Sequence, residues 1–258
     1  MSEKKVPKWA TKHFRSFLEY QKELGQILDL SIRGISMIRG VPSIFKAISK
    51  AEPEDEKYSS IDAIEQAKEL AEMAQREVDK EFPLLHSQAL VTLWGSLESL
   101  IEMFLADWIV HKTGAMQAES VQKLRVRLGE YELLSHDERG YYIVNLLKQE
   151  LGSPLKQGSN RFESLLKLVG LSGRIEDDVQ KTLFEMNHLR NVFVHRRGIA
   201  DKRLIEACPW LGYEVGDHVF LKHEDFLRYM EISAKYILEL ICRVSEHFGL
   251  DREYLDAN

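Results

Sequence analysis

The stretch QALVTLWGSLESLIEMFLADWIV, residues 88–110, decides the fold class of this chain. Its apolar residues recur at three- and four-residue spacing, which predicts a helix, and they cover nearly every side of that helix. A helix that is apolar all round is surrounded by other helices, so we expect residues 88–110 at the centre of a bundle. Pro83 fits the first turn of this helix. Gly95 and Ser96 leave a small patch on it, which either helix packing or a ligand site would explain.

The rest of the chain is also predicted to be helical. Apolar residues keep the helical spacing in three further stretches, Phe14–Ile38, Ile61–Val78 and Phe226–Val244. The exception is residues 213–221, where Val215 and Val219 flank a Gly216-Asp217 turn and predict a short hairpin. We therefore expect an all-α fold with one short β-hairpin insertion.

The charge pattern divides the chain near residue 82. Residues 1–50 carry ten Lys or Arg against four Asp or Glu, whereas residues 51–82 carry four against eleven. We interpret residues 1–82 as an N-terminal helical extension and residues 83–258 as a helical bundle. The basic amphipathic stretch 32–50 would pack against its acidic neighbour at 52–81, lie on an anionic membrane or bind a partner.

The overall composition excludes several classes of protein. A net charge of −6 argues against a protein that coats nucleic acid by bulk electrostatics, so any such contact must be local. Cys208 and Cys242 are too few for a zinc knuckle and fit a reducing compartment. The N-terminal residues lack the apolar core of an export signal, and the charge-free stretch 82–97 is too short to span a bilayer. We expect a soluble, cytoplasmic protein without a membrane span.

One segment, LFEMNHLRNVFVHRRG at residues 183–198, carries the pattern of a chemical site. At about 100° per residue, its large apolar side chains form a core face. His188, Asn191 and His195 would form a stripe pointing away from that face. Arg190 lies about 140° from His195 around the helix, so a long Arg side chain or a second copy of the chain would be needed to bring the two together. The basic pair and Gly198 that follow mark the helix end.

This segment resembles the HEPN superfamily, whose members carry an Arg and a His separated by four to six residues near the end of a late helix in an α-helical bundle. The match here is Arg190-Asn191-Val-Phe-Val-His195. A second similarity is Leu97-Glu98-Ser99-Leu100 in the early apolar helix. The resemblance covers residues 83–248, and the hairpin insertion departs from it. The resemblance implies a HEPN-like bundle that forms a homodimer, with a composite site where the two motif helices meet.

The resemblance also implies an activity, because many HEPN proteins are metal-independent endoribonucleases of toxin–antitoxin or antiviral defence systems. In such a site His195 would be the general acid or base, since an imidazole ordinarily exchanges protons near neutral pH. Arg190 would stabilise the charge on the phosphoryl oxygens. The ribose 2′-hydroxyl would attack the adjacent phosphorus, so RNA is the expected substrate. No metal or cofactor is expected, and an antitoxin or regulatory protein would be a further partner.

Other residues have supporting roles in this interpretation, each with a plainer alternative. Asn191 would hydrogen-bond the imidazole or the phosphate, or be an ordinary surface residue. Glu98 would be a polar partner of the motif, and His188 would assist at the interface. The plainer alternative is that both are ordinary polar residues on the surface of a helix. The basic run would contact the RNA backbone or form a solvated helix end: Arg196, Arg197, Lys202 and Arg203.

Three alternatives to a nuclease follow from the sequence. A zinc site at His188 and His195 is disfavoured because their spacing is seven residues and no acidic or Cys ligand lies at a fitting offset. A non-catalytic HEPN-like module would dimerise and bind RNA, nucleotide or protein. A structural helical adaptor would instead use the basic N-terminal segment as its functional surface.

Overall fold

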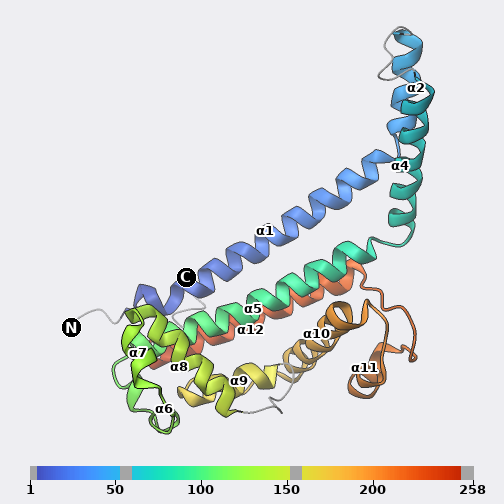
Figure 1. Ribbon diagram of the computed structural model, residues 1–258. Coiled ribbons are helices and arrows are strands. Elements are labelled where there is room, and N and C mark those ends of the chain that lie inside the picture. The colour runs from blue at the N-terminus through green and yellow to red at the C-terminus, as the bar shows by residue number, and fades with distance from the viewer. Residues whose placement is uncertain (1–4, 53–59, 152–158, 251–258) are drawn as a thin grey trace.

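The computed structural model describes residues 5–52, 60–151 and 159–250, and side chains in all of these except 159 and 160. The chain is mostly helical, which confirms the all-α prediction (Figure 1). The longer helices are α1 (Lys8–Ile38), α2 (Val41–Ala51), α4 (Ile61–Asp79), α5 (Pro83–His111), α8 (His136–Glu150), α9 (Ser159–Leu168), α10 (Asp177–Arg196) and α12 (His223–His247). Shorter ones are α6 (Glu119–Gln122), α7 (Leu128–Leu133), α11 (Lys202–Ala207) and the 3-10 turns η1 (Ala115–Gln117) and η2 (Pro209–Leu211).

Helix α5 is the centre of the bundle, as its sequence predicts. Pro83 starts the helix, and its buried residues include Leu93, Trp94 and Leu97, none of which is accessible to solvent. It packs against α1, α8, α10 and α12. Among the described residues it is also the one helix long and apolar enough to cross a membrane, but 56% of its most apolar window is buried in the bundle. That burial is typical of the core helix of a soluble protein.

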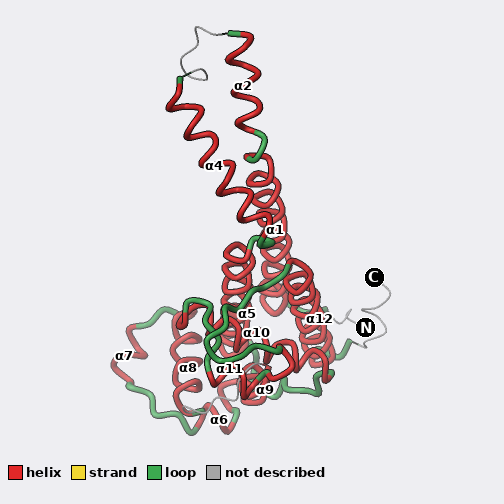
Figure 2. Tube along the Cα trace, turned by 90° about the vertical axis from the view of Figure 1, so that its right-hand side faces the viewer, coloured by secondary structure: helices red, strands yellow, loops and turns green. Residues whose placement is uncertain are grey.

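The N-terminal region divides between the core and a projecting arm. The first half of α1 is packed into the bundle, where the ring centroid of Phe14 lies 4.8 Å from that of Phe104 on α5. The second half leads to α2 and α4, which run side by side away from the bundle (Figures 1 and 2). Arg39 donates a hydrogen bond of 3.4 Å to Gln75 there. The basic stretch thus packs against its acidic neighbour, and only part of the predicted extension leaves the bundle.

The predicted β-hairpin at residues 213–221 is not formed. A turn does occur there, since Gly216 has a φ of +100° and Asp217 donates to the carbonyl of Glu214. The chain after the turn, however, pairs with the segment that leaves α10. Val219 donates to the carbonyl of Gly198 at 2.8 Å, and the described residues contain one isolated antiparallel bridge and no strand.

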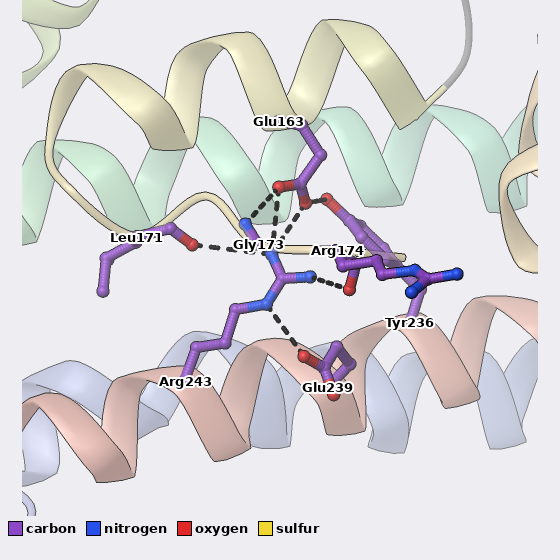
Figure 3. Close-up of polar contacts among 7 residues, drawn as sticks. All are labelled: Glu163, Leu171, Gly173, Arg174, Tyr236, Glu239 and Arg243. Atoms are coloured by element: carbon purple, nitrogen blue, oxygen red, sulfur yellow. Dashed lines mark hydrogen bonds and ion pairs between the residues drawn. The ribbon is translucent and has the colours of Figure 1, made fainter. Parts of the chain in front are cut away.

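A buried ion-pair cluster fixes α9 and the start of α10 on α12. Arg243 on α12 donates to both oxygens of Glu163 on α9 at 2.9 and 3.0 Å (Figure 3). Its other donors reach Glu239 and the carbonyl of Arg174, while Tyr236 bonds Glu163 at 3.0 Å. Arg243 is only 7% exposed, so these contacts are made away from water. The cluster therefore ties the α9–α10 connection to the core.

A second buried carboxylate holds the region after α10. Glu185 on α10 accepts hydrogen bonds from Trp210 at 2.7 Å, Arg228 at 2.6 Å and Tyr229. Burial raises the pKa of Tyr229, next to the Glu185 charge, so its hydroxyl remains a donor. The cluster anchors η2 and α12 on α10. Because η2 follows α11 directly, the cluster also keeps α11, with Lys202 and Arg203, near the C-terminal end of α10.

Candidate functional site

The end of α10 has the geometry that its sequence predicts. The helix stops at Arg196, and Arg197 and Gly198 follow with positive φ values of 55° and 77°. The N–H of Gly198 donates to the carbonyl of Val192 at 3.2 Å, which closes the last turn. This end therefore stands at the surface with a basic pair on it.

The predicted core face of α10 is confirmed, with Met186, Leu189 and Val192 buried. The predicted polar stripe is confirmed only near the helix end, where Asn191 is half-buried and His195 is exposed. His195 makes no hydrogen bond or ion pair with any other residue that the structure describes. Its imidazole is therefore open to solvent and to an incoming molecule.

The prediction that His188 points away from the core is wrong. His188 is only 3% exposed, and its ring centroid lies 4.6 Å from that of Phe184. Burial lowers its pKa, and the Arg203 charge on α11 adds to the effect. Its Nε2 has no hydrogen-bond partner among the described residues. Angular spacing on one helix cannot show that α11 folds back against α10, and a ring buried in this way cannot reach a second chain.

Arg190 is held by two polar neighbours beside the open face of α10. It donates to the Oδ1 of Asn191 at 3.0 Å, and its Nη2 lies 3.7 Å from the Oε2 of Glu98 on α5. The structure thus brings Glu98 to the motif, where the sequence suggested a polar partner. In the described part of the chain no contact joins Arg190 to His195. The two residues are about 140° apart around α10, and the half-buried Asn191 and the exposed Val194 lie between them on the helix surface.

The four basic residues predicted to bind RNA are all exposed and follow the motif within eight positions of His195 in the chain. Two of them already have acidic partners: Arg196 lies 3.2 Å from Asp201, and Lys202 lies 3.6 Å from Glu206. Arg197 and Arg203 make no ion pair with the residues described here. The local cationic surface is therefore smaller than the sequence count suggests.

Two features of the site have no counterpart in the sequence analysis. Arg161 on α9 donates to the Oε1 of Glu98 at 2.7 Å, so Glu98 touches two arginines. A surface groove of about 590 Å³ also lies between the start of α5 and the end of α10, and Phe193, Arg197 and Phe220 are among its lining residues. Arg161 is far from Glu98 in the chain, and no local pattern reveals that they meet.

Neither a metal centre nor a known relative adds to this description. Within residues 5–52, 60–151 and 159–250 no group of three His, Cys, Asp or Glu side chains is arranged to hold a metal ion. The chain matches no protein-family model, no curated protein and no solved structure. The resemblance to the HEPN superfamily therefore rests on the motif residues and the helical order alone.

Proposed function

We propose that this chain is a metal-independent endoribonuclease of HEPN type that acts as a homodimer. The observation that carries the proposal is the open face at the end of α10. His195 is exposed on one edge of that face and the part-exposed Arg190 lies on the other. Antiparallel apposition of two such faces about a twofold axis would bring the His195 of one copy toward the Arg190 of the other.

The chemistry follows from these two side chains. Neutral His195 accepts the proton of a ribose 2′-hydroxyl, whose oxygen attacks the adjacent phosphorus. The bond from phosphorus to the 5′-oxygen breaks, and that oxygen takes up a proton. The products are a 2′,3′-cyclic phosphate and a free 5′-hydroxyl. Arg190 stabilises the charge that builds on the phosphoryl oxygens, and Asn191 orients its guanidinium through the bond at 3.0 Å.

The test is cleavage of single-stranded RNA in EDTA by the parent and by a His195→Ala variant. We expect 2′,3′-cyclic ends from the parent and a rate lower by about 10²- to 10⁴-fold in the variant. The matched control is His136→Ala, another exposed histidine, on α8, which should cleave like the parent. Equal cleavage by parent and His195→Ala would refute the assigned role.

The contacts of Arg190 favour a second candidate, a non-catalytic HEPN-like module that binds RNA, nucleotide or a partner protein. Glu98 and Asn191 already contact the guanidinium group of Arg190, whose N–H donors a nuclease would need for binding the phosphate. This candidate predicts dimers that bind RNA without cutting it in the same assay. A toxin or antiphage role in the cytoplasm, with an antitoxin or regulatory partner, belongs to the first candidate.

A further inference from the structure

The Glu98 carboxylate lies between two arginines that come from different helices. Arg161 on α9 contacts its Oε1 at 2.7 Å, and Arg190 on α10 lies 3.7 Å from its Oε2. The three side chains are partly open to solvent, with exposures of 18% for Glu98 and 29% for each arginine. Three packed helices thus present a small charged cluster at the surface beside the motif.

This cluster has an unbalanced charge and spare donors. Two guanidinium groups share one carboxylate, which leaves one positive charge in excess. Each arginine has five N–H donors. Among the described residues, Arg161 uses one of its donors on Glu98 and Arg190 uses one on Asn191, apart from its longer contact with Glu98. The remaining donors can bind a second anion without breaking the fold.

We propose that Arg161 is a second residue that binds the RNA phosphate backbone, and that Glu98 is the internal anion with which the RNA competes. The inference rests on the proposed function, because it assigns a role beside the same site. A phosphodiester carries one negative charge and accepts the forked guanidinium geometry as a carboxylate does. Glu98 therefore orients both arginines and weakens RNA binding at the same time.

The groove at the end of α10 agrees with this placement. Val91 lines the groove and is seven residues before Glu98 on α5, about 10 Å along the helix. Arg197 lines the same groove from the end of α10. A single strand whose phosphate lies at Arg161 and Arg190 can therefore extend along α5 toward Arg197.

The experiment measures binding of the full chain to a single-stranded RNA with 2′-O-methyl sugars, which lacks the nucleophile and is not cleaved. Fluorescence anisotropy at several salt concentrations gives the Kd and its salt dependence. Arg161→Gln should weaken binding several-fold and reduce the slope of log K against log salt by about 0.7. Glu98→Gln should strengthen binding several-fold. Arg161→Lys should keep the slope while losing part of the affinity, because Lys lacks the fork.

The opposite signs separate this role from a structural one. Arg161→Gln and Glu98→Gln break the same ion pair, so a purely structural contact would shift both variants in the same direction, and that result overturns the inference. Matched controls are Glu102→Gln and Lys148→Gln, which break the neighbouring α5–α8 pair and should leave the Kd unchanged. If the parent binds RNA but Arg161→Gln binds equally well, only this inference fails. If the parent binds no RNA, the proposed function fails with it.

Discussion

Glu98 on α5 lies 3.7 Å from Arg190 on α10, although the two are far apart in the chain. The contact means that the motif arginine is oriented by the central helix of the bundle within a single chain. His195, in contrast, is exposed and has no polar partner among the residues described. An imidazole that acts as a general base needs a group that aims it, and in the proposed dimer the second chain would supply that group.

A mixture of two inactive variants tests whether the site is composite. Arg190→Gln and His195→Ala should each lower the cleavage rate in EDTA by about 10²- to 10⁴-fold. When they are mixed and allowed to exchange subunits, half of the dimers are mixed, and each has one site with both native side chains. We expect recovery of about one quarter of the parent rate, because one of two sites works in half of the dimers.

The same mixture also tests the alternative to a composite site, in which both catalytic side chains come from one chain. If Arg190 and His195 of one chain formed the site together, no mixed dimer would contain an intact site and the rate would stay at the low level of the two single variants. Size-exclusion chromatography with light scattering supplies the necessary control, since a strict monomer has no second copy to exchange.

Helix packing leads to a second prediction, at Gly140 on α8. A Cβ atom there would lie 2.5 Å from the carbonyl oxygen of Ala106 on α5, so Gly140→Ala must push two helices apart. We expect a loss of about 1–3 kcal/mol in the free energy of unfolding. Gly95→Ala on α5 is the control, because a Cβ atom there meets nothing within 4 Å and alanine favours a helix.

Urea unfolding followed by circular dichroism measures both variants. Gly95→Ala should be neutral or more stable by up to about 1 kcal/mol. Equal stability of Gly140→Ala and the parent would show that α8 can shift without cost, contrary to the close contact described above.

The helical elements could be predicted from the sequence because they depend on local spacing. The all-round apolar pattern of residues 88–110 gave α5 its central place, and Pro83 gave its start. The failed hairpin has a physical reason: the turn at Gly216 was visible, but the partner of Val219 is Gly198, outside the alternating segment. A backbone hydrogen bond to a segment elsewhere in the chain leaves no mark on either segment alone.

The site could be predicted only in part for the same reason. The exposure of His195 and the helix end at Gly198 follow from one helix and its capping residues. The burial of His188 depends on α11, and the meeting of Glu98 with Arg161 depends on the packing of α9 against α5. Contacts with other helices therefore decide whether such a residue is buried or exposed, whatever its angular position on its own helix.

Burial of His188 predicts a specific dependence of stability on pH. Burial and the nearby Arg203 lower its folded-state pKa, while Asp201 partly opposes this. The unfolded chain then binds a proton near the ordinary pKa of about 6.5, where the folded chain does not. Stability is therefore unaffected by this group above that pH and falls as the pH drops below it.

Replacement by an apolar residue should remove this dependence. We expect His188→Leu to gain stability relative to the parent as the pH is lowered from 8 to 5.5, since the substitution also removes an unpartnered Nε2. Urea unfolding at several pH values measures the difference between the two proteins. The other histidines with lowered pKa values, His86 and His247, are common to both and cancel. Parallel curves would show that His188 titrates normally in the folded chain.

The buried cluster of Arg243 leads to the last prediction. Arg243→Leu would leave Glu163, which is only 13% exposed, with Tyr236 and the Gly173 N–H as its polar partners, and a charge largely removed from water without a counter-charge is costly. We expect a loss of about 3–5 kcal/mol in the free energy of unfolding. The control is Arg33→Leu, because Arg33 is 73% exposed and its pair with Asp29 should contribute little. Since the cluster also holds α9, which carries Arg161, the variant that stays folded at low temperature should bind RNA more weakly than the parent. Unchanged stability together with unchanged RNA affinity would mean that α9 is held in place by its apolar contacts alone.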